Sequence, residues 1–236
     1  MQKARNEIKF VCTEQELRLV ESRIQHICKP DKHAGADGVY QIRSVYFDDC
    51  ENTCFYENEC GTDMREKYRI RIYNSTLEKI MLECKRKERD KNYKTSCPLS
   101  WEMCSAVLDK NRYGIRLNEG NVDWNEQQKM LFNKFCLQLK IRLFSPKIIV
   151  EYERTPYVYE QGNVRITFDR YIGFCKNIDE FGNKSISKRP VMSSGKHILE
   201  VKYDELLPDC LHDLFEDMNL QRSTFSKYYI CRKFEY

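Results

Sequence analysis

The sequence predicts an α+β fold: an antiparallel β-barrel of about eight strands with flanking helices and a C-terminal helix. Eight segments alternate apolar and polar residues, which is the pattern of half-buried strands. A few stretches with helical spacing interrupt these segments, and about eight strands suffice to close a small barrel. Neither a repeat nor a Pro/Gly-rich linker divides the chain, so we expect one domain over residues 1–236.

The first elements are a strand and a helix. The strand is expected at Glu7–Cys12. Thr13 and Glu16 form a capping-box pattern for the helix that follows. Apolar residues then recur at helical spacing: Leu17, Val20, Ile24 and Ile27. Cys28–Gly38 is expected to be a loop.

The remaining elements are predicted from the same two patterns, alternation for strands and helical spacing for helices. Strands are expected at Tyr40–Asp48, Arg65–Asn74, Lys79–Arg89, Tyr93–Cys97, Lys147–Tyr159, Val164–Phe174 and His197–Tyr203. A helix is expected at Pro98–Lys110, since proline favours a helix start. A second is expected at Trp124–Leu143, with Leu131, Phe135 and Leu139 on one face. Two short helices, near Pro208–Met218 and Ser223–Phe234, close the chain.

The composition is that of a globular protein. Hydrophobic residues make up 41% and charged residues 32%, and 15 Tyr and 12 Phe exclude a disordered chain. No apolar run approaches the roughly 18 residues of a membrane span, and the N-terminus lacks the apolar core of a signal peptide. We therefore expect a cytoplasmic protein without a membrane segment.

The twelve cysteines do not form a metal-binding pattern. No CxxC pair occurs, and the nearest grouping is Cys50, Cys54 and Cys60 with His33 upstream. Structural zinc sites usually show tighter paired spacing. Reduced thiols are therefore the favoured interpretation.

Charged residues gather on one face of several strands. Residues two apart share a face of a strand. This rule groups Arg65, Lys67, Arg69 and Arg71; Glu83, Lys85 and Lys87; Glu7 and Lys9; Arg165, Thr167 and Asp169; and Glu200 and Lys202. For one strand, a solvated polar face is the simpler interpretation. A solvated face does not explain repeated Arg-x-Arg and Lys-x-Lys on neighbouring strands, because like charges about 6 Å apart repel by roughly 2–3 kcal/mol.

A bound polyanion relieves this repulsion, so the pattern indicates a barrel interior that binds phosphate chains. Arginine matches phosphate oxygens bidentately, and lysine supplies a point charge. Mg²⁺ or Mn²⁺ usually takes one or two carboxylates together with phosphate oxygens. Glu200, Glu7 and Glu83 are the candidate metal ligands, Glu200 first. Nucleic acid is the disfavoured polyanion, because tyrosines beside the arginines are ordinary strand residues.

Eight motifs, in order, resemble a known family. RNEIKF, IRSVYFDD, YRIRIY, LECKRK, VEYERTPY, VRITFD, LEVKYD and FSKY are similar to the catalytic domain of the vacuolar transporter chaperone (VTC) complex, a member of the triphosphate tunnel (CYTH-like) superfamily. The resemblance runs from about Arg5 to Tyr228. It implies a tunnel of antiparallel strands and a polyphosphate polymerase that passes the γ-phosphoryl of ATP to a growing chain with Mn²⁺ or another divalent ion. ATP and inorganic polyphosphate are the partners it implies; a regulatory partner is unknown.

The resemblance also implies roles for single residues. The phosphate-binding cations would be Lys9, Arg69, Arg71, Lys85, Lys94, Arg154, Arg165 and Lys227, to which face periodicity adds Arg65, Lys67, Lys87 and Lys202. Glu200 would bind the metal. Of these, Lys9, Arg69, Arg71, Lys85, Arg165 and Glu200 are the expected catalytic residues.

The chain departs from the superfamily's patterns at two positions. Triphosphatases of the superfamily open with ExExK, and here Arg5 stands in place of the first glutamate, which favours the polymerase. The eukaryotic enzymes carry a basic residue three positions before the lysine of FSKY, where this chain has Thr224. A hydrolase or cyclase acting on triphosphates and a non-catalytic polyphosphate-binding module remain alternatives.

Overall fold

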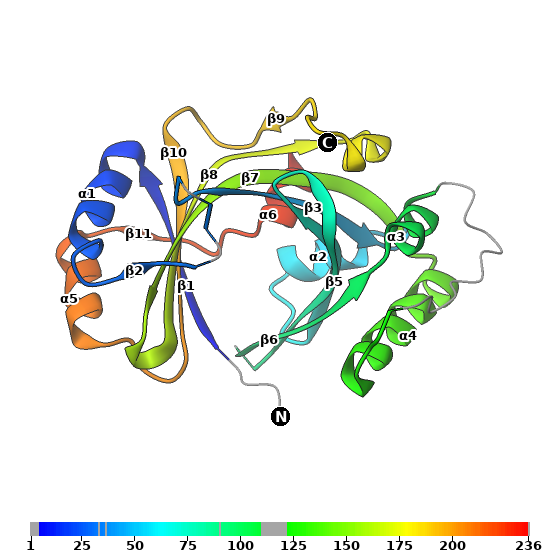
Figure 1. Cartoon of the computed structure of the whole chain (residues 1–236), viewed down its shortest axis with the longest axis horizontal. Helices are drawn as coiled ribbons and strands as arrows, with labels where there is room; N and C mark the ends of the chain where they lie inside the picture. Colours follow the sequence, from blue (N-terminus) through cyan, green and yellow to red (C-terminus); the bar gives the residue numbers. More distant parts are fainter. Residues whose placement is uncertain (1–4, 33, 36, 90, 110–121, 236) are drawn as a thin grey trace.

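The strands form one large antiparallel sheet (Figure 1). The computed structural model describes residues 5–32, 34–35, 37–89, 91–109 and 122–235. The sheet follows the path β11-β1-β10-β8-β7-β3-β4-β5-β6, while β2 pairs with β7 and β9 with β8. Its longer strands are β1 (Asn6–Thr13), β3 (Tyr40–Asp48), β4 (Arg65–Tyr73), β5 (Thr76–Glu88), β6 (Lys91–Leu99), β7 (Ser145–Tyr159), β8 (Val164–Cys175) and β10 (Lys196–Tyr203). All eight expected strands are present.

The sheet curls so that its two ends face each other (Figure 1). We call the end with β1 and β10 the β1 arm and the end with β5 and β6 the β5/β6 arm. In the described part of the chain the ladder stays an open path, and one isolated antiparallel bridge, Arg5 to Asn92, joins the β1 arm to the β5/β6 arm. There the Arg5 amide nitrogen lies 3.4 Å from the Asn92 carbonyl oxygen. The architecture is thus α+β with a strongly curled antiparallel sheet, and the closed barrel stays a prediction.

Six α-helices and two 3₁₀-helices accompany the sheet in the described ranges. They are α1 (Glu14–Ile24), α2 (Thr53–Glu59), α3 (Trp101–Leu108), α4 (Glu126–Ile141), α5 (Asp209–Asp217), α6 (Lys227–Lys233), η1 (Gln161–Asn163) and η2 (Ile178–Gly182). The capping box at the start of α1 forms as expected. None of the helices in the described ranges is both long and apolar enough to span a membrane.

Two of the expected helices, α3 and α6, begin later in the chain than predicted. Pro98 belongs to β6, and α3 begins at Trp101, because the side chain of Ser100 caps it by accepting from the Met103 amide. The expected end of this helix, Lys110, lies outside the described residues. The last helix begins at Lys227, not at Ser223, because the side chain of Ser226 caps it by accepting from the Tyr229 amide. The short strand β11 (Gln221–Arg222), which pairs with β1, lies before it.

Helix α2 and the two-residue strands β2 (Lys29–Pro30), β9 (Arg189–Pro190) and β11 were not expected from the sequence. The carboxylate of Asp48 at the end of β3 accepts hydrogen bonds from the amides of Cys54 and Phe55 in α2. It also accepts a hydrogen bond from the hydroxyl of Tyr228. Asp48 therefore fixes α2 and α6 to the same strand.

The apolar core lies on the outer side of the curled sheet. Ile70 and Ile72 of β4 are fully buried with Phe135 of α4 in one cluster. Leu199 of β10 and Leu17 of α1 belong to a second cluster at the other arm. Helices α1 and α5 cover the β1 arm, and α3 and α4 cover the β5/β6 arm (Figure 1). Since side chains alternate along a strand, this packing directs the charged residues toward the inside of the curl.

Candidate functional site

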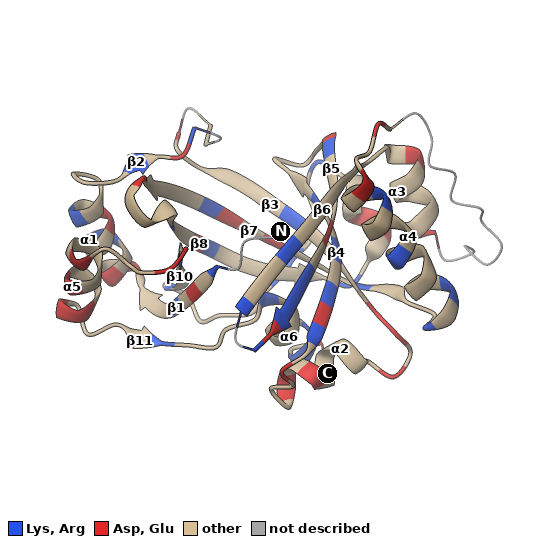
Figure 2. Ribbon diagram, turned by 90° about the horizontal axis from the view of Figure 1, so that it is seen from below, with Lys and Arg blue, Asp and Glu red and all other residues tan. Residues whose placement is uncertain are grey.

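A cavity of about 660 Å³ lies inside the curl and is lined by residues from both arms. Its lining includes thirteen Lys and Arg side chains against three carboxylates, an excess of ten positive charges. The whole chain carries only +4, so the rest of the chain has a net charge of −6. Figure 2 shows the blue bands of Lys and Arg along the strands of both arms. Every expected phosphate-binding cation is among the lining residues.

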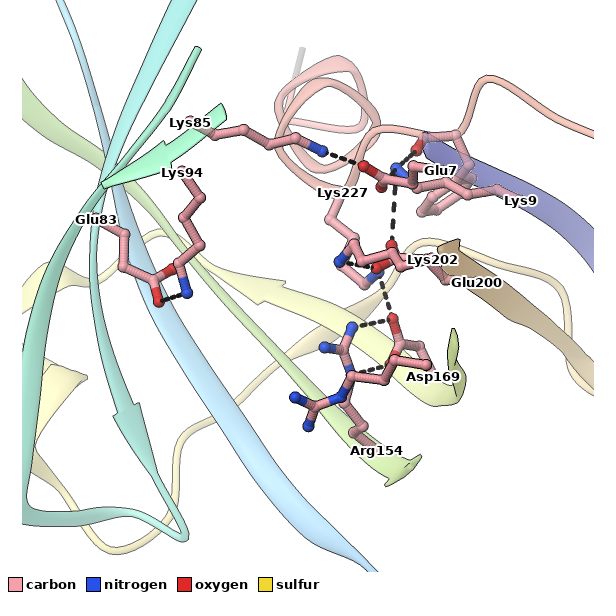
Figure 3. Close-up of polar contacts among 12 residues, drawn as sticks. Glu7, Lys9, Glu83, Lys85, Lys94, Arg154, Asp169, Glu200, Lys202 and Lys227 are labelled. Carbon is pink, nitrogen blue, oxygen red and sulfur yellow. Dashed lines mark hydrogen bonds and ion pairs between the residues drawn. The ribbon is translucent and has the colours of Figure 1, made fainter. Parts of the chain in front are cut away.

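One wall of the cavity, formed by β1 and β10, pairs opposite charges across the two strands. Lys9 lies opposite Glu200, and Glu7 lies opposite Lys202. The Lys9 ammonium is 2.9 Å from Glu7 Oε1 and 3.8 Å from Glu200 Oε2. Lys202 contacts Glu200, and Lys85 reaches across from β5 to contact Glu7 (Figure 3). The two carboxylates are thus surrounded by ammonium groups.

These contacts set the charge states of the wall. Burial alone would raise the pKa of Glu7, but Lys9, and more weakly Lys202 and Lys85, hold it well below its usual range. Burial likewise opposes ionisation of Glu200, and Lys202 and Lys9 lower its pKa well below its usual range. Both carboxylates are therefore ionised at neutral pH.

The opposite wall is organised by Glu83 of β5. Glu83 is 3% exposed, and its Oε2 lies 2.6 Å from Arg69 Nη2 and 3.7 Å from Arg71 Nη1. Its Oε1 contacts the ammonium of Lys94 on β6 (Figure 3). The hydroxyl of Tyr46 accepts a further hydrogen bond from Arg69 at 2.9 Å. The carboxylate holds three cations at fixed positions along the cavity.

A fourth carboxylate, Asp169 of β8, is completely buried at the base of the site. It accepts two hydrogen bonds from Arg154, at 2.6 and 2.7 Å, and contacts the ammonium of Lys227 at the start of α6. Lys227 also lies over the ring of Tyr152, 4.7 Å from its centroid. The charge of Asp169 raises the pKa of Lys227 against the effect of burial. Asp169 therefore positions two of the expected cations.

Three lysines form a strip of like charge across β4, β5 and β6. Lys67 lies opposite Lys85, and Lys85 lies opposite Lys94. Desolvation lowers the pKa of Lys67 to about 7, helped by the neighbouring cations. Desolvation also lowers the pKa of Lys85 and of Lys94 to about 8, although the negative charges of Glu7 and Glu83 oppose the shift.

Lys67 contacts neutral groups. Its ammonium donates to Asn58 of α2 and, at 3.1 Å, to the Ser226 hydroxyl at the start of α6. Lys9 similarly donates to the backbone carbonyl of Phe225 at 2.9 Å. Two cavity lysines thus hold the segment that leads into α6.

The outer part of the lining contains the remaining expected cations. Arg165 lies 2.9 Å from Asp31 and donates to the Tyr40 hydroxyl at 3.2 Å. Arg65 and Lys87 face each other across β4 and β5. Thr224 also lines the cavity.

The predicted metal ligands divide into two groups. Glu7 and Glu200 contact the same ammonium of Lys9, whereas Glu83 lies on the other wall (Figure 3). The described residues contain no cluster of three His, Cys, Asp or Glu side chains that could hold a metal ion. His33, which the cysteine grouping includes, lies outside the described residues.

A divalent ion nevertheless fits beside Glu200. The hydroxyl of Thr167, opposite Glu200 in the ladder, is buried without a hydrogen-bond partner. Two ionised carboxylates and a spare hydroxyl form an oxygen donor set of the kind that Mg²⁺ or Mn²⁺ completes with phosphate oxygens.

Sequence reasoning missed several residues of the site. Periodicity groups Asp169 with Arg165 but indicates no role for it, because Asp169 contacts Lys227, 58 positions later in the chain. Tyr46, Tyr152 and Ser226 contact the cations through hydroxyls or rings. Tyrosine at strand positions gives no signal of such a role.

Comparisons with known proteins agree with this geometry. The chain matches the VTC domain model over residues 4–236, and no curated protein matches it. Its fold is similar to that of a putative adenylate cyclase from Bacillus halodurans, at 11% identity and a TM-score of 0.54, with 94% of this chain and 95% of that chain covered. It is also similar to a putative adenylyl cyclase from Hippeastrum with a dominant triphosphatase activity, at 10% identity and a TM-score of 0.55, with 98% and 95% covered. The match to the family model spans nearly the whole chain, and the chain therefore belongs to the VTC domain family.

Proposed function

We propose that this chain is a polyphosphate polymerase, which transfers the γ-phosphoryl of ATP to a growing inorganic polyphosphate chain with the help of Mn²⁺ or Mg²⁺. The observation that carries the proposal is the cavity with thirteen cations and three carboxylates. Such an excess of fixed positive charge suits a ligand with a negative charge on each phosphate. Membership of the VTC domain family supports the same substrate class. The cytoplasm, where ATP is available, is the proposed location.

The reaction asks for positioning more than for covalent chemistry. Phosphoryl transfer depends mainly on alignment of the phosphates and on stabilisation of their charge. In this proposal Arg69 and Arg71, which contact Glu83, hold the triphosphate together with Lys85 and Arg165 of the same lining. Because phosphate oxygens are ionised near pH 7, a terminal phosphate oxygen of the polyphosphate attacks the γ-phosphorus without a general base, the bond to the β,γ-bridging oxygen breaks, and ADP leaves.

Glu200 and Glu7 are the residues that would hold the divalent ion, with Lys9 between them. When bound, the ion supplies charge neutralisation at the phosphate oxygens. The protein's own part is to keep both carboxylates ionised and at the same place on the β1/β10 wall. Lys9 and Lys202 keep them ionised through opposite charge.

A triphosphate hydrolase or cyclase is the second candidate, because one similar structure is described as having a dominant triphosphatase activity. Arg5 argues against hydrolysis. Where the superfamily's triphosphatases carry the first glutamate of ExExK, the Arg5 side chain lies 3.2 Å from Asp204 at the cavity mouth. The wall therefore has one carboxylate fewer and one cation more than the hydrolase pattern requires.

The test is incubation of the purified protein with γ-labelled ATP and Mn²⁺ or Mg²⁺, followed by gel separation of the products. We expect label in long chains that a polyphosphatase degrades. Label only in free phosphate would establish the hydrolase instead. Unchanged ATP together with bound polyphosphate would leave a binding module.

Two matched variants connect the activity to the cavity. Arg71→Met removes a buried lining cation and should lower chain synthesis by at least about a hundredfold, as is typical when a group that stabilises transition-state charge is lost. Arg18→Met removes an arginine from the outer surface of α1, where its side chain is 76% exposed. This control should keep wild-type activity, and equal losses in both variants would contradict the assignment.

A further inference from the structure

Helix α4 has an exposed apolar ridge on its outer side. Met130, Leu137 and Ile141 are 70%, 51% and 70% exposed, and Leu143 just beyond the helix is 49% exposed. At about 100° per residue, the three helical side chains fall within roughly 40° of one another. The opposite side of the same helix is buried in the core. Large apolar side chains aligned in this way on a surface mark an interaction site.

Cations accompany the ridge. Helix α4 and its C-cap carry Lys129, Lys134, Lys140 and Arg142 against a single acid, Glu126. Arg142 is paired with Asp49, and Lys129 and Lys134 contact Glu126 and Glu66 but stay 44% and 48% exposed. Lys129, Lys134 and Lys140 are therefore the cations that the ridge presents to a partner. The residues outside the cavity lining sum to a net charge of −6, because the lining alone contributes ten positive charges to a chain of net charge +4. Helix α4 is therefore a basic and apolar surface on a protein whose residues outside the cavity carry a net negative charge.

We propose that α4 is a peripheral docking surface for an anionic lipid bilayer, with Met130, Leu137 and Ile141 entering the headgroup region and the lysines contacting lipid phosphates. An apolar ridge with flanking lysines is the pattern by which amphipathic helices bind anionic membranes. A second copy of this chain suits the ridge less well. Two such helices packed on each other would bring their lysines together, and like charges repel.

Docking through α4 is independent of the cavity. The helix packs against the outer side of β6 (Figure 1), and none of its residues lines the cavity. The surface would therefore hold the protein at a membrane whichever reaction the cavity carries out. Its test needs no activity measurement.

The experiment is co-sedimentation of the full chain with vesicles of phosphatidylcholine containing phosphatidylglycerol, at physiological ionic strength. Excess tripolyphosphate is present, so that cavity cations do not bind the headgroups. We expect binding to these vesicles and at least about tenfold weaker binding to vesicles of phosphatidylcholine alone, because attraction to anionic lipid contributes to interfacial binding.

A matched pair of variants locates the surface. Leu137→Glu with Ile141→Glu should weaken binding by about tenfold or more, because it removes apolar contact and adds negative charge. Leu19→Glu with Leu206→Glu makes the same charge change at residues that are 48% and 81% exposed on the other side of the molecule. This control should bind like the wild type.

Three results would overturn the proposal: no binding of the wild type to anionic vesicles, equal losses in both double variants, or a dimer in light scattering that the α4 variant abolishes. Thermal melting checks that the variants fold. Should the glutamate pair unfold the helix, Lys129→Gln with Lys140→Gln tests the same surface through charge alone. Unchanged binding of that variant would also refute lipid docking.

Discussion

The strip of three lysines makes polyphosphate binding depend on pH in a way that can be calculated. In the unliganded protein the pKa of Lys67 is lowered to about 7, and the pKa values of Lys85 and Lys94 to about 8. A polyanion favours the charged form of each lysine and raises these values on binding. Binding therefore takes up protons, and affinity is highest below pH 7 and falls as the pH rises through 8.

The size of the effect follows from the protonated fractions. Between pH 6.5 and 8.5 the three lysines together predict a loss of affinity of up to roughly 400-fold, of which about 25-fold comes from Lys67. At pH 8 the binding of one ligand should take up about two protons. Lys67→Met removes the group with the lowest pKa, and should leave roughly a 16-fold loss and an uptake of about one proton.

Isothermal titration calorimetry measures both quantities. Titrations with long-chain polyphosphate, whose interior phosphates keep a constant charge over this range, are run at constant ionic strength in buffers of different ionisation enthalpy. Lys184→Met, which removes an exposed lysine outside the cavity lining, is the control and should match the wild type. Affinity that stays constant or rises with pH, or a Lys67→Met variant with unchanged proton uptake, would refute the reasoning.

Three substitutions of carboxylates test the rest of the structure. Glu200→Gln should abolish metal-dependent turnover while the protein stays folded, and full activity in the labelled-ATP assay would exclude Glu200 as the metal ligand. Asp169→Asn leaves Arg154 and Lys227 buried without an ionised partner and should cost about 3–5 kcal/mol in the free energy of unfolding, measured by urea denaturation. Asp48→Ala removes the carboxylate that accepts hydrogen bonds from two amides of α2 and from the Tyr228 hydroxyl of α6, and should lower the free energy of unfolding by about 2–4 kcal/mol. A melting temperature within a degree of wild type would contradict that role.

The strands and their inward faces could be predicted because both depend on a local rule. Alternation along β4 places Arg69 and Arg71 on one face and Ile70 on the other, and the structure has Ile70 in the core and both arginines in the cavity. The first helix was predictable for the same reason, since its capping box lies within four consecutive residues. Membership of the VTC domain family, expected from eight short motifs, is confirmed by the match over residues 4–236.

What could not be predicted depends on distant parts of the chain. Helix α2 follows Asn52, which has a positive φ of 58° and whose side chain makes no capping hydrogen bond, so this helix does not start in the usual way. Its amides are satisfied by Asp48, which lies in the preceding strand. Whether the arms of the sheet close depends on accumulated twist, which the sequence pattern does not report. The assignment of Glu7, Glu83 and Glu200 as metal ligands stays a prediction.

The carboxylates of the cavity orient its cations more than they neutralise them. Glu83 and Asp169 each fix two or three cations through short contacts, yet the lining keeps an excess of ten positive charges. Loss of these acids would raise the net charge of the lining, but it would also leave buried cations without partners, as predicted for Asp169→Asn. A site that transfers a phosphoryl group needs its donors fixed before the charge develops, because fixed donors cost no reorganisation during the reaction. The buried acids thus provide the fixed donors that the proposed phosphoryl transfer requires, and they also offset the cost of burying those cations.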